Sequence, residues 1–365
     1  MHARIGWQNL RTSEFLDSGD YMLITGTDFE DGTINYSTCH YVEKERYEQD
    51  KNIQIRNGSI LITKDGTLGK VAYVQGLTMP ATLNAGVFNV EIKDKKETDE
   101  KYLFQYLKAP FLMDYVTRHA TGGTIKHLNQ SILINFPVYM PKKSEQEKIG
   151  LYLMQLDSLI TLHQRKCEET KKLKKYMLQK MFPQNGKRVP EIRFAGFTDD
   201  WEQRKLSDVV DSVDTGKSKF DKEGSSGEYP ILGSTSVIGY DDEYDYEGDF
   251  ILTARVGANA GSLDRHAGKV KISDNTVFIQ ASQNIEFLYQ LLIRFDIKRL
   301  SFGTGQPLVK ASELKRLELM MPTDMEEQMR IGVYFKNLDH LITLHQRKYE
   351  ELQKIKKFML QNMFI

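Results

Sequence analysis

Glycine-rich segments in both halves of the chain combine glycine with Lys, Arg, Thr, Asn and Gln, side chains that are suited to contact nucleic acid. Glycine lets a backbone approach a ligand closely, amides and hydroxyls bond phosphate oxygens, and cations neutralise phosphate charge. Arg and Lys can read guanine, whereas Asn and Gln can read adenine. An ordinary surface-loop residue is the alternative interpretation of each position. The candidate DNA-binding residues are Lys64, Thr67, Lys70, Thr124, Lys126, His127 and Asn129 in the first half, and Lys217, Lys219, Arg255, Asn259, Gln306 and Lys310 in the second.

The motifs that would support covalent chemistry are incomplete. Gly216-Lys217-Ser218 matches the end of a phosphate-binding P-loop, but Asp211 stands where that motif needs its first glycine, and its carboxylate would repel phosphate. The Glu-x-Lys triplets at residues 91–93 and 313–315 are common by chance, and the Asn-Pro-Pro-aromatic motif of amino-group methyltransferases is missing. Two cysteines are too few for a disulfide scaffold or a Cys-rich zinc site. We therefore predict no catalytic residue, no metal site and no cofactor in this chain.

An internal repeat supplies the elements that would position the loops. Residues 146–182 align without gaps on residues 328–364, and by direct count 24 of these 37 positions are identical, including the octapeptide LITLHQRK. Apolar residues recur at steps of four and three, which predicts a long helix with a heptad contact seam in each copy. Ser144 followed by Glu147 predicts a capping box at the start of the first helix. The predicted seam and subunit-docking residues are Leu153, Leu156, Ile160, His163, Phe335, Leu338, Ile342 and His345.

The two helices are expected to pair with each other. Each could instead merely cap its own domain, but a second apolar flank, formed by Leu159, Leu162, Leu341 and Leu344, is wider than a two-helix seam needs. We therefore expect the remaining apolar surface to face other chains. His163 and His345 occupy equivalent seam positions and are interpreted as packing residues rather than metal ligands.

The regions outside the helices differ from each other but share one order of features. Each has an apolar strand (60–63 or 250–253), a glycine-rich turn, short strands, a helical stretch (100–119 or 285–300), a Gly/Thr loop and a last strand that ends at residue 140 or 321. An entrance segment anchored by Phe194 and Trp201 precedes the second region, and we expect the first to lack it. The sequence thus predicts a mixed α/β fold with globular domains at 1–144 and 186–325, and long helices at 145–185 and 326–365.

Composition limits the class of protein. Lys plus Arg and Asp plus Glu are both 50, and 40% of residues are hydrophobic, which excludes a uniformly basic nucleic-acid coat and a disordered chain. No apolar stretch is long enough for a signal peptide or a membrane span. We expect a cytoplasmic protein with no membrane partner.

These motifs together resemble the DNA-specificity (S) subunits of type I restriction-modification enzymes. The resemblance rests on the helix starts Ser144-Glu145-Gln146 and Glu326-Glu327-Gln328, the following Ile-Gly-x-Tyr and Leu-Asp-x-Leu-Ile, the segment LITLHQRK, and the ending Met-Leu-Gln-x-Met-Phe. The entrance Val189 to Phe194, which leads to Trp201, also matches. The likeness covers essentially the whole chain and departs from the family pattern at the N-terminus.

The resemblance implies a non-catalytic subunit. Each globule would be a target-recognition domain for one half of a bipartite site in double-stranded DNA, and the helices would form an antiparallel coiled coil that sets the spacer. Modification subunits, expected to be two, would dock on the helices and methylate adenine with S-adenosylmethionine. Restriction subunits would add translocation and cleavage with ATP and Mg²⁺, in defence of the host. A coiled-coil scaffold whose globules bind protein or peptide is the alternative, and an enzyme with an unrecognised site is a third possibility.

Overall fold

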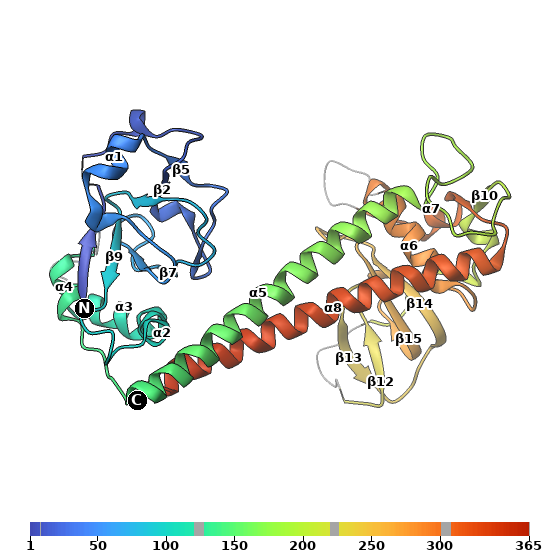
Figure 1. Cartoon of the computed structure of the whole chain (residues 1–365). Helices are drawn as coiled ribbons and strands as arrows, with labels where there is room; N and C mark the ends of the chain where they lie inside the picture. The colour runs from blue at the N-terminus through green and yellow to red at the C-terminus, as the bar shows by residue number, and fades with distance from the viewer. Residues whose placement is uncertain (8, 120–127, 220–225, 301–307, 365) are drawn as a thin grey trace. The chain divides into compact units, whose positions relative to one another are not determined.

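The chain divides into two compact units, each built from one globule and parts of both long helices. The computed structural model describes residues 1–7, 9–119, 128–219, 226–300 and 308–364. The first unit comprises Met1–His163 with Arg347–Ile365, and the second comprises Gln164–Gln346 (Figure 1). The long helices are α5, Lys143–Lys180, and α8, Met325–Asn362.

The globule of the first unit contains a four-stranded sheet, a three-stranded sheet and a two-stranded sheet of β3 and β4. The four-stranded sheet is antiparallel with the order β1-β9-β6-β7, and in the three-stranded sheet β2 lies between β5 (antiparallel) and β8 (parallel). The strands are β1 (His2–Ile5), β2 (Met22–Ile24), β3 (Phe29–Glu30), β4 (Thr33–Ile34), β5 (His40–Tyr41), β6 (Ile60–Thr63), β7 (Val71–Tyr73), β8 (Ala81–Leu83) and β9 (Val87–Glu91), and the helices are α1 (Lys44–Gln49), α2 (Glu100–Lys108), α3 (Pro110–His119) and α4 (Gln130–Asn135).

The globule of the second unit contains a six-stranded sheet in the order β11-β16-β14-β15-β12-β13 and a two-stranded sheet of β10 and β17. The strands are β10 (Glu202–Lys205), β11 (Ser212–Thr215), β12 (Tyr229–Leu232), β13 (Val237–Asp241), β14 (Tyr246–Ala254), β15 (Leu263–Ile272), β16 (Thr276–Gln280) and β17 (Glu318–Met321), and the helices are α6 (Ile285–Phe295) and α7 (Ala311–Lys315).

The predicted apolar strands are confirmed, and each faces two cores. Successive side chains of a strand point to opposite faces of its sheet. In β6, Ile60 and Ile62 pack in the core that contains α2 and α3, whereas Leu61 packs with Met22 and Ile24 on the other face. A run of apolar residues without alternation is therefore what a strand covered on both faces requires.

Two of the predicted elements were wrong in part. The helical stretch 100–119 is two helices, because Pro110 disfavours helical geometry at Ala109, whose φ and ψ are −67° and 159°. The last strand predicted to end at residue 140 is wrong: α4 ends at Asn135, and residues 136–142 lie in neither helix nor strand. Pro137 and Pro141 supply no amide donors for a strand there.

The long helices are confirmed as 38-residue elements, each roughly 57 Å long at about 1.5 Å per residue. The predicted capping box is wrong, because α5 already begins at Lys143 and Ser144 lies inside it. For α8 the side chain of Asp324 accepts hydrogen bonds from the amides of Glu326 (2.7 Å) and Glu327 (3.4 Å). These bonds satisfy two of the free amides at the helix start.

The predicted seam residues are all at least partly removed from solvent. Leu153, Leu156, Phe335 and Leu338 are buried, and the remaining four are partly buried. In the first unit Leu153 and Leu156 share a core with Leu352 of α8. In the second unit Lys174 and Cys167 of α5 contact Asp339 and Gln346 of α8 respectively, so the two helices run antiparallel there. A coiled coil over the full length of both helices stays a prediction.

Candidate nucleic-acid interface

In the first globule the glycine-rich turn joins β6 to β7 and presents two of the predicted residues to solvent. The amide of Gly69 donates to the carbonyl of Thr63 (2.9 Å), and Gly66 and Gly69 adopt φ values of +71° and +74°, a region that favours glycine. The buried Thr63 hydroxyl accepts a bond from the Lys70 amide (2.9 Å) and donates to the Thr67 carbonyl. This bonding holds the Thr67 and Lys70 side chains exposed at the tip of the hairpin.

Two further predicted residues of the first half lie beside this turn. The carbonyl of Lys64 accepts a hydrogen bond from the Leu128 amide (3.0 Å), which brings Asn129 next to the turn. Lys64 is partly buried, and its Nζ lies 3.7 Å from the Asp65 carboxylate, so it is less available to a phosphate than Lys70. The predicted residues Thr124, Lys126 and His127 lie outside the described residues.

In the second globule the predicted residues gather at adjacent loops. Arg255 follows β14; its guanidinium donates to the Asp274 carbonyl (3.4 Å), and the Asp274 amide donates to the Ser218 carbonyl (3.1 Å). Ser218 lies between Lys217 and Lys219, which are both exposed. These bonds place the two lysines and the arginine in one neighbourhood, although nothing in the local sequence connects them.

The same neighbourhood includes the last predicted loop. The Arg255 carbonyl accepts a bond from the Val309 amide (2.8 Å), so the exposed Lys310 lies nearby, immediately before α7. Asn259 is exposed in the turn that the Gly261 amide closes onto the Ala254 carbonyl (3.0 Å). Gln306 lies outside the described residues.

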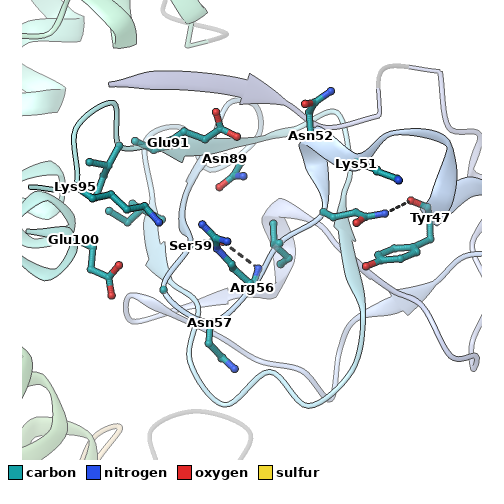
Figure 2. A pocket seen from close by; sticks show the side chains of 16 residues that line it. Tyr47, Lys51, Asn52, Arg56, Asn57, Ser59, Asn89, Glu91, Lys95 and Glu100 are labelled. Atoms are coloured by element: carbon teal, nitrogen blue, oxygen red, sulfur yellow. Dashed lines mark hydrogen bonds between the residues drawn. The ribbon is translucent and has the colours of Figure 1, made fainter. Parts of the chain in front are cut away.

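Sequence reasoning missed a polar pocket in the first globule. This pocket has a volume of about 500 Å³ and is lined by the loop at 51–59 and by the end of β9. Figure 2 shows its lining side chains from close by. Its lining carries cations and acids together, including Arg56, Lys95 and Glu91, and the buried Asn89 also lines it. The loop has one glycine and no repeated pattern, so no signal in the sequence singled it out.

The repeated motif residues of the long helices have matching structural roles in the two units. A Cβ at Gly150 would lie 2.6 Å from the Tyr102 amide of α2, and one at Gly332 would lie 2.8 Å from the Phe287 amide of α6. These glycines therefore let α2 and α6 pack directly against α5 and α8. The Ile-Gly-x-Tyr motif thus marks a close helix crossing in each unit.

The glutamine three residues before this motif joins the start of each long helix to its globule. Gln146 donates to the Pro141 carbonyl (2.8 Å) and accepts from the amide of Asp99, the residue that caps α2 (2.9 Å). Gln328 likewise donates to the Pro322 carbonyl (2.7 Å) and accepts from Asn284, which precedes α6 (3.2 Å). The duplication is therefore one of three-dimensional structure as well as of sequence.

The entrance segment is tied to the second unit, as its aromatic residues predicted. Trp201 is 1% exposed, and Phe194 packs against the same core with its ring 6.1 Å from that of Tyr334. Arg193 forms a two-pronged ion pair with the buried carboxylate of Glu327, at 2.7 and 2.8 Å. The hydrogen bonds to Glu327 raise the pKa of Arg193 above its usual value, although burial acts in the opposite direction.

The described part of the chain contains neither a candidate metal centre nor a candidate membrane span. Its His, Cys, Asp and Glu residues form no cluster of three or more that could hold a metal ion. None of its helices is both long and apolar enough to cross a bilayer.

Comparisons with known proteins agree with this duplicated arrangement. A family model described as the type I restriction modification DNA specificity domain matches residues 6–172 and again residues 198–354. The MjaVIII specificity subunit of a type I restriction enzyme from Methanocaldococcus jannaschii is 27% identical over 344 residues, covering 84% of this chain and 78% of that protein. The MjaX specificity subunit from the same organism, which is described as putative, is 24% identical over 361 residues, covering 90% and 82%.

A solved structure has the same fold. The S subunit of a type I restriction-modification system from M. genitalium aligns with a TM-score of 0.71 at 17% identity, covering all of this chain and 93% of that one. The family model matches twice, and each match takes in one globule with most of a long helix. This chain therefore belongs to the family of type I restriction-modification DNA specificity subunits.

Proposed function

We propose that this chain reads a bipartite target in double-stranded DNA, with one globule for each part of the target. The observation that carries the proposal is the twofold match to the specificity domain, at 6–172 and 198–354. The exposed loop residues support it, because Lys, Thr and Asn beside glycine turns can bond both phosphates and base edges. The two sets of loops differ in sequence, so the two half-sites should differ as well.

The long helices would hold the two recognition domains at a set separation and dock the other subunits. We retain 1–144 and 186–325 as recognition domains and 145–185 and 326–365 as the connecting helices. The predicted second apolar flank is exposed: Leu159, Leu162, Leu341 and Leu344 are 43%, 41%, 41% and 50% exposed. Exposed leucines at equivalent positions of both repeats would suit two copies of one modification subunit, each on its own repeat.

The chemistry of the complex would lie outside this chain. Modification subunits would bind S-adenosylmethionine and methylate adenine, and restriction subunits would use ATP and Mg²⁺ for translocation and cleavage. The chain described here would contribute recognition, spacing and docking, and would work in the cytoplasm.

The test is methylation-sensitive sequencing of DNA from cells that express this chain with a modification subunit. We expect methylated adenines within one bipartite motif whose two parts differ. Replacing Leu159 and Leu341 with Asp should abolish co-purification of the modification subunit without unfolding this chain, because both side chains are exposed. Genomic DNA that carries no bipartite methylated motif would refute the proposal.

Salt dependence separates this function from that of a scaffold for protein or peptide ligands. Each phosphate contact releases counterions, so the logarithm of the DNA affinity should fall with the logarithm of salt concentration at about −0.9 per phosphate contacted. A flat salt dependence together with capture of a defined peptide would favour the scaffold.

A further inference from the structure

A partly buried carboxylate on α5 joins three elements of the first unit. Asp157 accepts a hydrogen bond from the side chain of Gln105 on α2 (2.7 Å) and an ion-paired bond from Lys356 on α8. A second cation, Lys108 of α2, lies 3.4 Å from the same carboxylate. Gln105 is fully buried and Lys356 is 6% exposed, whereas the side chains of Asp157 and Lys108 keep 22% and 23% of their exposure, so the junction is partly shielded from water.

The second unit contains the same junction with the helices exchanged. Asp339 of α8 accepts a bond from Gln290 of α6 (3.0 Å) and from Lys174 of α5 (2.6 Å). Arg265 of β15 lies 3.8 Å from this carboxylate. Arg265 also pairs with Glu286, which in turn pairs with Lys336 (2.9 Å).

The two junctions correspond through the internal repeat. Asp157 matches Asp339, and Lys174 matches Lys356, at the offset that aligns the two helices. Each lysine therefore donates a hydrogen bond to the carboxylate of the other repeat. In an antiparallel pair of helices, the residue numbers of two contacting residues add up to a constant. The total is the same for both Asp–Lys pairs and for the contact between Cys167 and Gln346. One antiparallel register thus accounts for all three contacts.

Stability alone does not explain these junctions. Removing a carboxylate and an ammonium group from water costs free energy that their attraction often fails to offset, and apolar residues of similar volume are commonly as good or better. The Oε1 atoms of both Gln105 and Gln290 are also buried without a hydrogen-bond partner in the part of the chain that the structure describes. A buried polar contact instead specifies the register of the helices, because its hydrogen bonds are satisfied in one register and unsatisfied in others.

We propose that the two Gln–Asp–Lys junctions are positioning residues for target recognition. They fix each globule and the partner helix to one carboxylate, and thereby determine the spacer length that the two recognition domains accept. The inference rests on the proposed function, because a spacer has meaning only for a bipartite target.

The test replaces both junctions with apolar residues that conserve volume. The variant carries Gln105→Met, Asp157→Leu and Lys356→Met in the first unit and Gln290→Met, Asp339→Leu and Lys174→Met in the second. Lys108 then retains its bond to the Asp31 carbonyl (2.9 Å), and Arg265 retains Glu286. The matched control, Arg165→Gln with Glu169→Gln, removes an exposed ion pair within α5.

The measurement is the affinity of the complex with modification subunits for DNA duplexes with spacers one or two base pairs shorter or longer. For the wild-type complex and the control, we expect binding to fall at least about tenfold away from one spacer length, because misplaced half-sites lose base contacts of that size. For the apolar variant we expect the differences to shrink to within about threefold, with the best spacer still bound as tightly as by the wild type.

A variant that discriminates between spacers as sharply as the wild type would overturn the proposal. Should the apolar variant not fold, Gln105→Met with Gln290→Met removes only the link to the globules and the two unpaired oxygens, so it should fold and still widen spacer tolerance. Unchanged tolerance there would likewise overturn the inference. A wild-type complex that binds no bipartite target at all would instead refute the proposed function.

Discussion

Phe182, two residues after the end of α5, should be one of the largest single contributors to the stability of the second unit. It is 2% exposed, and its ring centroid lies 5.8 Å from that of Trp201 and 5.9 Å from those of Phe287 and Phe335. Phe182→Ala removes a buried aromatic ring whose neighbours come from α6, α8 and the entrance segment. Changes of this kind in protein cores cost about 3–5 kcal/mol in the free energy of unfolding.

The assay follows urea unfolding through the fluorescence of Trp201. The chain has two tryptophans, so a Trp7→Phe background leaves Trp201 as the only one, and its signal reports on the second unit. The control is Met329→Ala on α8, which lies in the same unit, where the side chain is 53% exposed and the loss should stay within about 0.5 kcal/mol. A loss below about 1 kcal/mol for Phe182→Ala would show that the end of α5 is not anchored in this core.

Three further changes test other parts of the structure. Gly150→Ala should lower the free energy of unfolding by about 1–3 kcal/mol in a denaturant titration, because the new Cβ meets the α2 backbone, whereas Gly86→Ala enters open space and should be neutral. Burial, together with a neighbouring lysine, lowers the pKa of Lys356 to about 8, so the folded protein binds fewer protons than the unfolded chain between that pH and the ordinary lysine pKa of about 10.4. The free energy of unfolding should therefore rise with pH through this window relative to Lys356→Met, and a parallel pH dependence of the two proteins would contradict the burial argument. Lys70→Gln should make the slope of log affinity against log salt shallower by about one in DNA-binding titrations, whereas Lys96→Gln, on the exposed loop before α2, should leave it unchanged.

The candidate site could be predicted from sequence only as a set of local features. Glycine-rich turns with Lys, Thr and Asn are visible in the chain, and Gly66 and Gly69 do adopt the left-handed geometry that makes glycine informative. The grouping of Lys217 and Lys219 with Arg255 depends on a bond from the Arg255 guanidinium to the Asp274 carbonyl and on a backbone bond from Asp274 to Ser218, which join segments that are distant in sequence. Periodicity and composition carry no record of such bonds. The assignment of these residues to DNA contact stays a prediction.

The sequence by itself determined the duplication, the two long helices and the apolar strands, because helix and strand periods follow from side-chain spacing along one segment. The break before Pro110 was also visible there, and it was missed because the apolar pattern runs through it. Only the tertiary structure decided that Asp157 pairs with Lys356 and Asp339 with Lys174, across separations of 199 and 165 residues. A heptad pattern repeats along its helix and so allows several registers, whereas a buried ion pair is satisfied in one, and that choice appears only when both helices and their globules are folded together.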